Sequence, residues 1–148
     1  MSDATDLERA YVETIYWVDA LPEPIALRIG EHSRVLDRLL VQNAVQDCAI
    51  VTAWNPHSEQ VTSWRNVARQ ASLLRSLRIQ GYRWVGALGE GDDGAWPAEP
   101  GALVLGMRKD AALRLGRRFA QHAVVLAKLG CKPALAWCAG GDKRRLTR

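Results

Sequence analysis

The sequence lacks the features by which membrane and exported proteins are most easily recognised. None of its apolar runs approaches the ~20 residues that a helix needs to cross a bilayer. Residues 1–6 contain no basic segment leading into an apolar core, so we expect no signal peptide. The chain has 3 cysteines, an odd number, and none of them form a CxxC pair. We therefore expect reduced thiols in a cytoplasmic protein that does not associate with membranes.

The usual motifs of metal, nucleotide and nucleophile sites are missing as well. The 3 histidines show none of the HxxH, HxxxH or HExxH spacings of metal sites. Residues 89–94 match GxGxxG, but this loop is rich in carboxylates and is followed by Ala95, Trp96 and Pro97 instead of a helix. Ser58 does not lie in a GxSxG turn. The sequence thus predicts no metal and no cofactor.

Size and composition indicate one globular domain over residues 1–148. The chain is 48% hydrophobic and 24% charged, and a chain of 148 residues can bury most of its apolar surface. Its net charge of +4 is unevenly distributed. Residues 1–60 contain 4 basic and 10 acidic residues, whereas residues 61–148 contain 16 and 6. Residues 140–148 read as a basic, frayed tail.

The basic second half of the chain suits an anionic partner such as nucleic acid. Two ordinary explanations of this charge distribution stay open. The acidic and basic halves can attract each other within the fold or across a dimer, or the basic helix face is simply solvated, as such faces commonly are. The sequence does not indicate an oligomeric state. The basic side chains that would contact phosphates are Arg114, Arg117, Arg118, Lys143, Arg144 and Arg145.

Hydrophobic periodicity and chain-breaking residues predict an α/β fold, with α+β as the variant. We expect a mixed sheet of about five or six strands with about four helices packed on it. Ser33 is a plausible N-cap for one of these helices. Helices are predicted at 6–18, 33–43, 58–80 and 109–121, and strands at 25–29, 47–54, 82–88, 102–107, 123–129 and 133–139.

The clearest candidate site is the turn between the strand at 47–54 and the helix that follows. Ligands of open α/β sheets tend to bind beyond the carboxyl ends of strands, and a helix N-terminus there attracts anions. Helical spacing puts a polar strip opposite the apolar stripe centred on Ala71. We therefore expect a polar cleft for a small anionic or nucleotide-like ligand, with ordinary helix capping and a solvated helix face as the alternative. The candidate binding residues here are Thr52, Asn55, Ser58, Asn66 and Arg69.

An enzyme using the same cleft is a second hypothesis. His57 lies in the turn, and Glu99 lies at the end of the loop at 89–100. If that loop folds over the cleft, the two side chains could serve as an acid–base pair. The simpler interpretation is that His57 is an exposed residue of the first helical turn.

The run Thr52-Ala53-Trp54-Asn55-Pro56 with Ser58 resembles the hallmark of domain-of-unknown-function family 3293. Further matches cover nearly the whole chain and include Tyr11, Thr14, Asn66, Arg69, Gly81 and the segment at 119–121. The sequence departs from the family pattern at 99–102, where it keeps only the acidic residue. The resemblance implies a bacterial protein with this fold and implies no activity.

Gln121 is the residue on which periodicity and resemblance disagree. Helical spacing puts it on the solvated face with the arginines, whereas the resemblance includes it in the family pattern. We include it among the candidate ligand-binding residues. Taken together, the sequence predicts a binding or regulatory domain, with an enzyme and a nucleic-acid-binding protein as alternatives.

Overall fold

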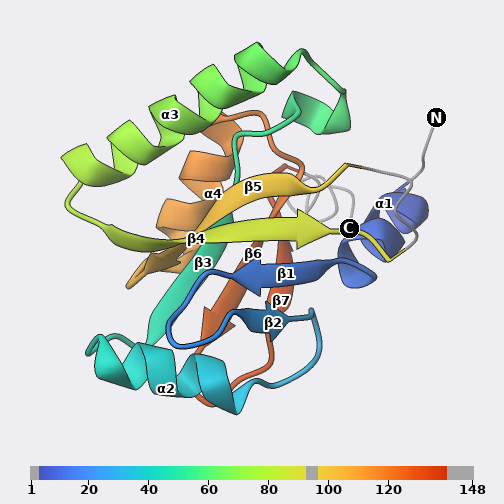
Figure 1. Ribbon diagram of the computed structural model, residues 1–148. Coiled ribbons are helices and arrows are strands. Elements are labelled where there is room, and N and C mark those ends of the chain that lie inside the picture. The colour runs from blue at the N-terminus through green and yellow to red at the C-terminus, as the bar shows by residue number, and fades with distance from the viewer. Residues whose placement is uncertain (1–3, 93–96, 140–148) are drawn as a thin grey trace.

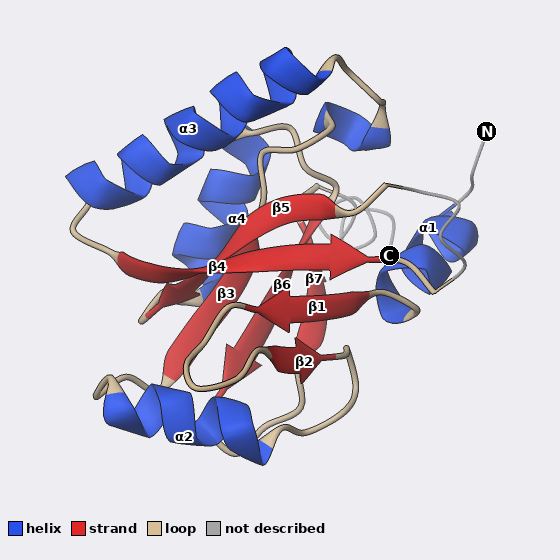
Figure 2. Cartoon of the chain, in the orientation of Figure 1, coloured by secondary structure: helices blue, strands red, loops and turns tan. Residues whose placement is uncertain are grey.

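The computed structural model describes residues 4–92 and 97–139, shown in Figures 1 and 2. Helices cover both sides of one sheet, so the predicted combination of helices and strands is confirmed. The elements are α1 (Ala4–Val12), β1 (Ile15–Val18), β2 (Ile25–Leu27), α2 (Arg34–Gln42), β3 (Asp47–Val51), the 3-10 turn η1 (Pro56–Ser58), α3 (Ser63–Ile79), β4 (Arg83–Glu90), β5 (Glu99–Leu105), α4 (Lys109–Arg118), β6 (Ala123–Lys128) and β7 (Ala134–Trp137).

The sheet has 7 strands in the order β2-β1-β4-β5-β3-β6-β7. Every neighbouring pair is antiparallel, so the expected mixed sheet of five or six strands is corrected. The additional strand is β1, which lies within the helix predicted at 6–18. Ile15 and Val18 fit helical spacing, but Tyr16 and Val18 are the buried residues, which is the alternation of a strand.

The sheet is curled, and its two edges approach each other. The backbone N–H of Gly30, after β2, donates to the carbonyl oxygen of Pro133, just before β7, at 2.8 Å. Across the same opening, the ring of Tyr11 in α1 packs edge-on against Trp137 of β7, with ring centroids 6.0 Å apart. The curl gives the sheet an inner and an outer face.

Two hydrophobic cores lie on opposite faces of the sheet. In β3, Ala49 and Val51 belong to the core beneath α3 and α4, whereas Cys48 and Ile50 belong to the core shared with α2. This period-two alternation is what a strand buried on both faces requires. Figure 1 shows α3 and α4 over one face, α2 on the other, and α1 at the end of the sheet.

Helix α3 packs with the side opposite to the predicted apolar stripe centred on Ala71. Trp64 is 69% exposed, and Ala68 and Ala71 of the predicted core stripe are exposed too. Asn66, with 3% exposure, and Ser76 are buried together with the leucines of the inward face. The helix also begins at Ser63 instead of residue 58, after the separate turn η1.

Free thiols are present at all 3 cysteine positions, and Cys48 and Cys138 are buried. Burial, followed by the charge of Asp47, raises the pKa of the Cys48 thiol to about 12, which keeps it protonated and unreactive. Within residues 4–92 and 97–139, no helix is long and apolar enough to cross a membrane. The predicted tail at 140–148 lies outside the described residues.

Candidate functional site

A cavity of about 330 Å³ lies at the end of the sheet that α1 covers. Its walls come from α1, five strands and the turns after β3 and α4, so distant parts of the sequence meet there. The lining residues are Leu7, Ala10, Tyr11, Thr14, Tyr16, Ile50, Val51, Thr52, Asn55, Ser58, Ala87, Gly89, Gly91, Glu99, Gly101, Gln121, Ala123, Val124 and Val125.

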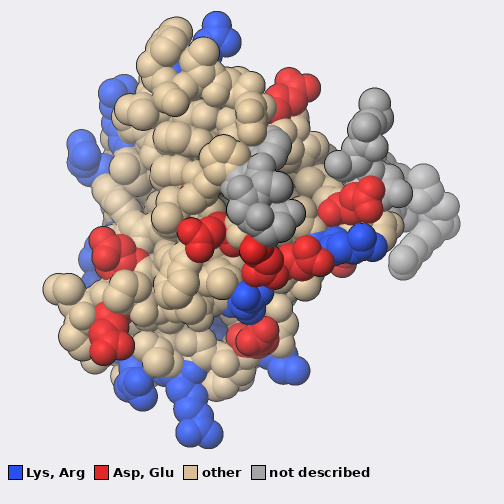
Figure 3. All heavy atoms as spheres, turned by 45° about the vertical axis from the view of Figure 1, so that its right-hand side comes forward, with Lys and Arg blue, Asp and Glu red and all other residues tan. Residues whose placement is uncertain are grey.

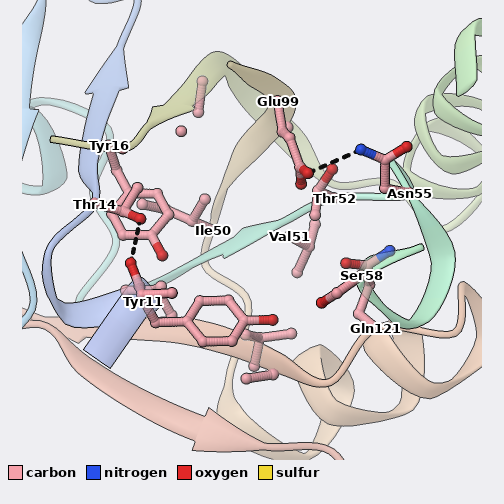
Figure 4. Close-up of a pocket in the computed structure, with 18 of the residues that line it drawn as sticks. Tyr11, Thr14, Tyr16, Ile50, Val51, Thr52, Asn55, Ser58, Glu99 and Gln121 are labelled. Atoms are coloured by element: carbon pink, nitrogen blue, oxygen red, sulfur yellow. Dashed lines mark hydrogen bonds between the residues drawn. The ribbon is translucent and has the colours of Figure 1, made fainter. Parts of the chain in front are cut away.

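Most of the wall is apolar, with two tyrosines on the side of α1 and β1 (Figure 4). Burial and then the negative charge of Glu99 raise the pKa of the Tyr11 phenol above its usual value. Burial and then Tyr11 raise the pKa of the Tyr16 phenol in the same way. Both phenols are therefore neutral at physiological pH and can donate or accept hydrogen bonds.

The polar wall is organised around Asn55 (Figure 4). Its side-chain Nδ2 donates to Glu99 Oε2 at 3.0 Å, which joins the turn after β3 to the start of β5. Its backbone N–H donates to Asn66 Oδ1, and its own Oδ1 accepts from Asn66 Nδ2, both at 2.8 Å. The backbone N–H of Val61 donates to the same Oδ1 at 3.2 Å. Helix α3 thereby holds Asn55 and, through it, orients the Glu99 carboxylate.

Thr52 closes the same corner from the end of β3. Its hydroxyl donates to the carbonyl oxygen of Pro100 at 2.6 Å and accepts from the backbone N–H of Trp54 at 3.0 Å. The donor hydrogen and one acceptor position of this hydroxyl are therefore used within the protein. The side chain fixes the spacing of β3 and β5 at the cavity.

Gln121 reaches the cavity because α4 is shorter than predicted. The helix ends at Arg118, and Ala120 adopts a left-handed conformation with φ 58°. The chain therefore turns inward, and Gln121 is only 9% exposed. Its Nε2 donates to the carbonyl oxygens of Trp54 and Phe119 at 3.1 and 3.2 Å. The helical wheel failed here because the residue lies outside the helix.

Left-handed backbone conformations are concentrated next to this site. Asn55, His57 and Ser58 have φ values of 46°, 53° and 59°. Such conformations of residues other than glycine cost on the order of 1–3 kcal/mol each, less for asparagine, and persist only where the surroundings enforce them. The N–H of His57 donates to the carbonyl oxygen of Ala120 at 2.6 Å, which ties the two left-handed segments together.

The predicted ligand residues separate into two groups. Thr52, Asn55, Ser58 and Gln121 line the cavity, whereas Asn66 and Arg69 do not. Asn66 binds Asn55 from behind, as described above. The guanidinium of Arg69 donates through Nε to the carbonyl oxygen of Ala53 at 2.7 Å and through Nη2 to that of Phe119. This cation therefore holds two turns together and is not part of the cavity wall.

Of the two proposed acid–base residues, only one lines the cavity. Glu99 lines the cavity, and His57 does not. His57 is exposed, and its ring lies against His122, with ring centroids 5.7 Å apart. Within the described residues, no cluster of three or more His, Cys, Asp and Glu side chains suits a metal ion.

The basic residues of α4 lie outside the cavity, and their guanidinium groups have partners in the protein. Arg114 pairs with Asp110 at 3.5 Å. Arg117 donates through Nε to the carbonyl oxygen of Cys138 at 2.7 Å, and Arg118 donates to Ser76 Oγ at 3.1 Å. The other basic candidates, Lys143, Arg144 and Arg145, lie outside the described residues.

The charge of the described cavity wall is negative. Its described lining residues include Glu99 and no lysine, arginine or histidine. Figure 3 brings the α1 side of the molecule forward and shows acidic side chains near the middle of that face, with most basic side chains towards its rim. An anion would therefore find no positively charged partner among these described lining residues.

Sequence reasoning missed the part of the wall that α1 and β1 supply. Tyr11 and Thr14 entered only through the resemblance, and Tyr16 was taken as part of a helix. The run of β-branched and aromatic residues at 15–18 was the sequence signal that could have identified this strand and with it Tyr16.

Comparison with known sequences gives one match. The family model described as protein of unknown function (DUF3293) matches residues 51–124, which bears out the resemblance carried by the run at 52–56. The matched segment contains Thr52, Asn55, Ser58, Glu99 and Gln121 of the cavity wall. No curated protein and no solved structure matches the chain.

Proposed function

Because the chain belongs to the DUF3293 family of proteins of unknown function, its activity has to be inferred from the site, and we propose that it binds a small molecule in the cavity beneath α1. The observation that carries this proposal is a mostly apolar cavity with a few polar groups converging on one wall. Small-molecule sites in proteins commonly have this composition, and the volume of about 330 Å³ lies in their usual range.

The construction of the polar wall supports binding over a merely structural role. The turn that presents Asn55 and Ser58 contains three left-handed residues, and such conformations cluster at functional sites. Asn55 and Gln121 are held by hydrogen bonds to α3 and to two backbone carbonyls. A polar group that is fixed before the ligand arrives loses little conformational entropy on binding.

The lining charge favours an uncharged or cationic ligand over the anionic or nucleotide-like one that the sequence suggested. Arg69, the cation expected to meet an anion, donates to backbone carbonyls instead. An enzyme that pairs His57 with Glu99 has no specific support either, because His57 is not a lining residue. Binding is therefore the function that we carry forward.

Filling the cavity should abolish binding while leaving the fold intact. Ala87 lines the cavity from β4 and is only partly buried, so Ala87→Phe places an aromatic ring in the cavity with little rearrangement of the sheet. We expect ligands found by an NMR fragment screen of the wild type to bind this variant at least about tenfold more weakly, because a ring filling the site excludes them. The measurement is a chemical-shift titration of each hit.

Leu88→Phe is the matched control for this experiment. It adds a ring at the next position of the same strand, where the side chain is 37% exposed and does not line the cavity. Hits should bind the control as they bind the wild type. A screen without hits, or hits that bind Ala87→Phe unchanged, would count against the cavity as a binding site.

Nucleic-acid binding is a second candidate, and the arrangement of α3 and α4 is the observation in its favour. The two helices lie over the same face of the sheet (Figure 1), and α3 contains four arginines and no carboxylate. Arg65, Arg75 and Arg78 are exposed, and Arg65 lies over the ring of the exposed Trp64 at 5.7 Å. Exposed aromatic and basic groups together suit a single strand.

If this second candidate is correct, affinity for a labelled single-stranded oligonucleotide should fall steeply with salt. Replacing Arg65, Arg75 and Arg78 with glutamine should flatten the salt slope by about 0.7 for each lost phosphate contact. Arg34→Gln with Arg38→Gln on α2, on the other face, is the control. Fluorescence anisotropy over a salt series decides, and no binding at low salt rejects the idea.

A further inference from the structure

Gln121 directs a hydrogen-bond acceptor into the cavity. Its Nε2 lies within hydrogen-bond distance of two carbonyl oxygens, those of Trp54 and Phe119. Because both neighbours are acceptors, the atom that faces them is the nitrogen, and the oxygen Oε1 points the other way. Gln121 is 9% exposed and lines the cavity, yet no described residue donates to its Oε1. A ligand N–H would supply the partner that this buried acceptor lacks.

Ser58 supplies a hydroxyl beside this acceptor. Figure 4 shows the side chains of Ser58 and Gln121 next to one another, across the cavity from Tyr16. The Ser58 hydroxyl has no hydrogen-bond partner among the described residues. Ser58 is exposed although it lines the cavity, so it lies where the cavity opens to solvent. A hydroxyl can donate as well as accept, so the two side chains offer a ligand one donor and one acceptor side by side.

The other hydroxyl groups of the described wall have partners in the protein. The phenol of Tyr11 interacts with the backbone of Ala123, and that of Tyr16 interacts with the side chain of Thr14. The hydroxyls of Thr14 and Thr52 donate to backbone carbonyls at 2.7 and 2.6 Å. A phenol with one partner keeps further hydrogen-bonding capacity. The wall therefore offers donors as well as acceptors, and a ligand that has both complements it.

Resting on the proposed function, we propose that the ligand of this cavity is an uncharged molecule with a primary carboxamide or lactam head and an apolar body. The N–H of the head donates to Gln121 Oε1, and its carbonyl oxygen accepts from the Ser58 hydroxyl. These two groups lie on one edge of such a head, so neighbouring side chains can bind them together. The apolar body lies against Ile50 and Val125, which are buried in the cavity wall. The pairing uses no charged side chain.

Four probes with the same phenyl body test this class: 3-phenylpropanamide, 4-phenylbutan-2-one, 3-phenylpropionate and 3-phenylpropylammonium. In NMR titrations of the wild type at neutral pH, the amide should bind about tenfold more tightly than the ketone, whose methyl group leaves Gln121 Oε1 without a donor. The propionate should bind more weakly than the ketone, because it brings a charged oxygen towards Oε1. The ammonium should bind more weakly than the amide, since it has no acceptor for Ser58 and its charge loses hydration.

Intermolecular NOEs on the wild type measure the orientation of the bound amide. The amide protons of the probe should show NOEs to the side chain of Gln121. Its phenyl protons should show NOEs to the methyl groups of Ile50 and Val125. The reverse orientation, with the phenyl ring at Ser58 and the amide at Val125, would contradict the proposed pairing. This measurement needs no variant and therefore does not depend on how a substitution affects folding.

Ser58→Gly tests the hydroxyl half of the pairing. Ser58 has φ 59°, a conformation that glycine adopts without strain, so the substitution removes the hydroxyl and keeps the turn. It should weaken the amide and the ketone alike, by about threefold to tenfold, because both carbonyls lose the same donor. His57→Gly is the matched control, since His57 has φ 53°, is exposed and does not line the cavity. An equal loss of affinity in both variants would contradict a role for the hydroxyl.

The outcomes separate this inference from the proposed function. Tightest binding of the amide, in the expected orientation and weakened by Ser58→Gly, supports both. Equal or tighter binding of another probe, with binding lost in Ala87→Phe, overturns the carboxamide class and leaves the cavity as a binding site. Fragment hits in the cavity with no binding of the four probes have the same meaning. If neither these probes nor a fragment screen yields binding, both are overturned.

Discussion

Replacing Asn66 with alanine should lower the free energy of unfolding by about 2–3 kcal/mol, because it leaves buried polar groups of Asn55 without partners. The backbone N–H of Asn55 loses its acceptor, and its Oδ1 loses one of two donors. Asn55 is itself buried, so water cannot readily replace these bonds. For a domain of this size the loss corresponds to a melting temperature lower by about 5–10 °C.

Urea or thermal unfolding followed by circular dichroism measures this effect. Val67→Ala is the matched control, because its side chain is 59% exposed at the next position of the same helix and its loss should change stability by less than ~0.5 kcal/mol. Asn66→Asp should be at least as harmful as Asn66→Ala, because a buried carboxylate would face the oxygen of Asn55. Equal midpoints for Asn66→Ala and Val67→Ala would show that Asn66 does not hold the turn.

Gly101→Ala should destabilise the protein by about 1–3 kcal/mol, although glycine to alanine in regular structure usually helps. A Cβ atom at this position would lie 2.7 Å from the carbonyl oxygen of Val51 and 3.4 Å from Thr52 Cβ. The nearest atom belongs to the backbone of the central strand β3, so a side-chain rotation cannot relieve the contact. The strands have to move apart at the point where they border the cavity.

Gly86→Ala in the neighbouring strand β4 is the control for this substitution. A Cβ atom at Gly86 meets nothing within 4 Å, so this variant should be as stable as the wild type or slightly more so. Chemical unfolding of both variants compares them directly. If Gly101→Ala is as stable as Gly86→Ala, β5 is free to shift, and the cavity wall is less rigid than the structure indicates.

Local signals in the sequence were sufficient where a single element decides the structure. The helix predicted at 33–43 is confirmed, because Ser33 caps α2 by accepting from the N–H of Leu36 at 3.0 Å. Its core residues Leu36 and Leu40 follow helical spacing. Capping and periodicity are properties of neighbouring residues, so they can be read without the rest of the chain.

The parts that failed depend on contacts between distant residues. Helix α3 buries Asn66 and exposes Trp64 because Asn66 forms two hydrogen bonds with Asn55, which lies eleven residues earlier in the sequence and outside the helix. Periodicity treats asparagine as a solvent-facing residue. The prediction therefore assigned the wrong face of the helix to the core. Strand direction is invisible to periodicity as well, so the sheet was expected to be mixed.

The candidate site was predicted only in part, because its geometry also depends on contacts between distant residues. The turn after β3 drew attention through its residue types, and four of the six predicted ligand residues line the cavity: Thr52, Asn55, Ser58 and Gln121. The roles of Asn66 and Arg69 were different from those expected, since both hold the backbone of the turn. A residue type indicates which bonds a side chain can make, and only the fold determines whether the partner is a ligand or the protein itself.

The hydrogen bond between Gly30 and Pro133 has a consequence for how copies of this chain meet one another. Open sheet edges offer unpaired backbone groups on which a second chain can add a strand. Here the two outermost strands are only three and four residues long, and the curl turns them towards each other. The edge strands therefore expose few backbone groups with which a second chain could pair, and polymerisation by strand addition is disfavoured.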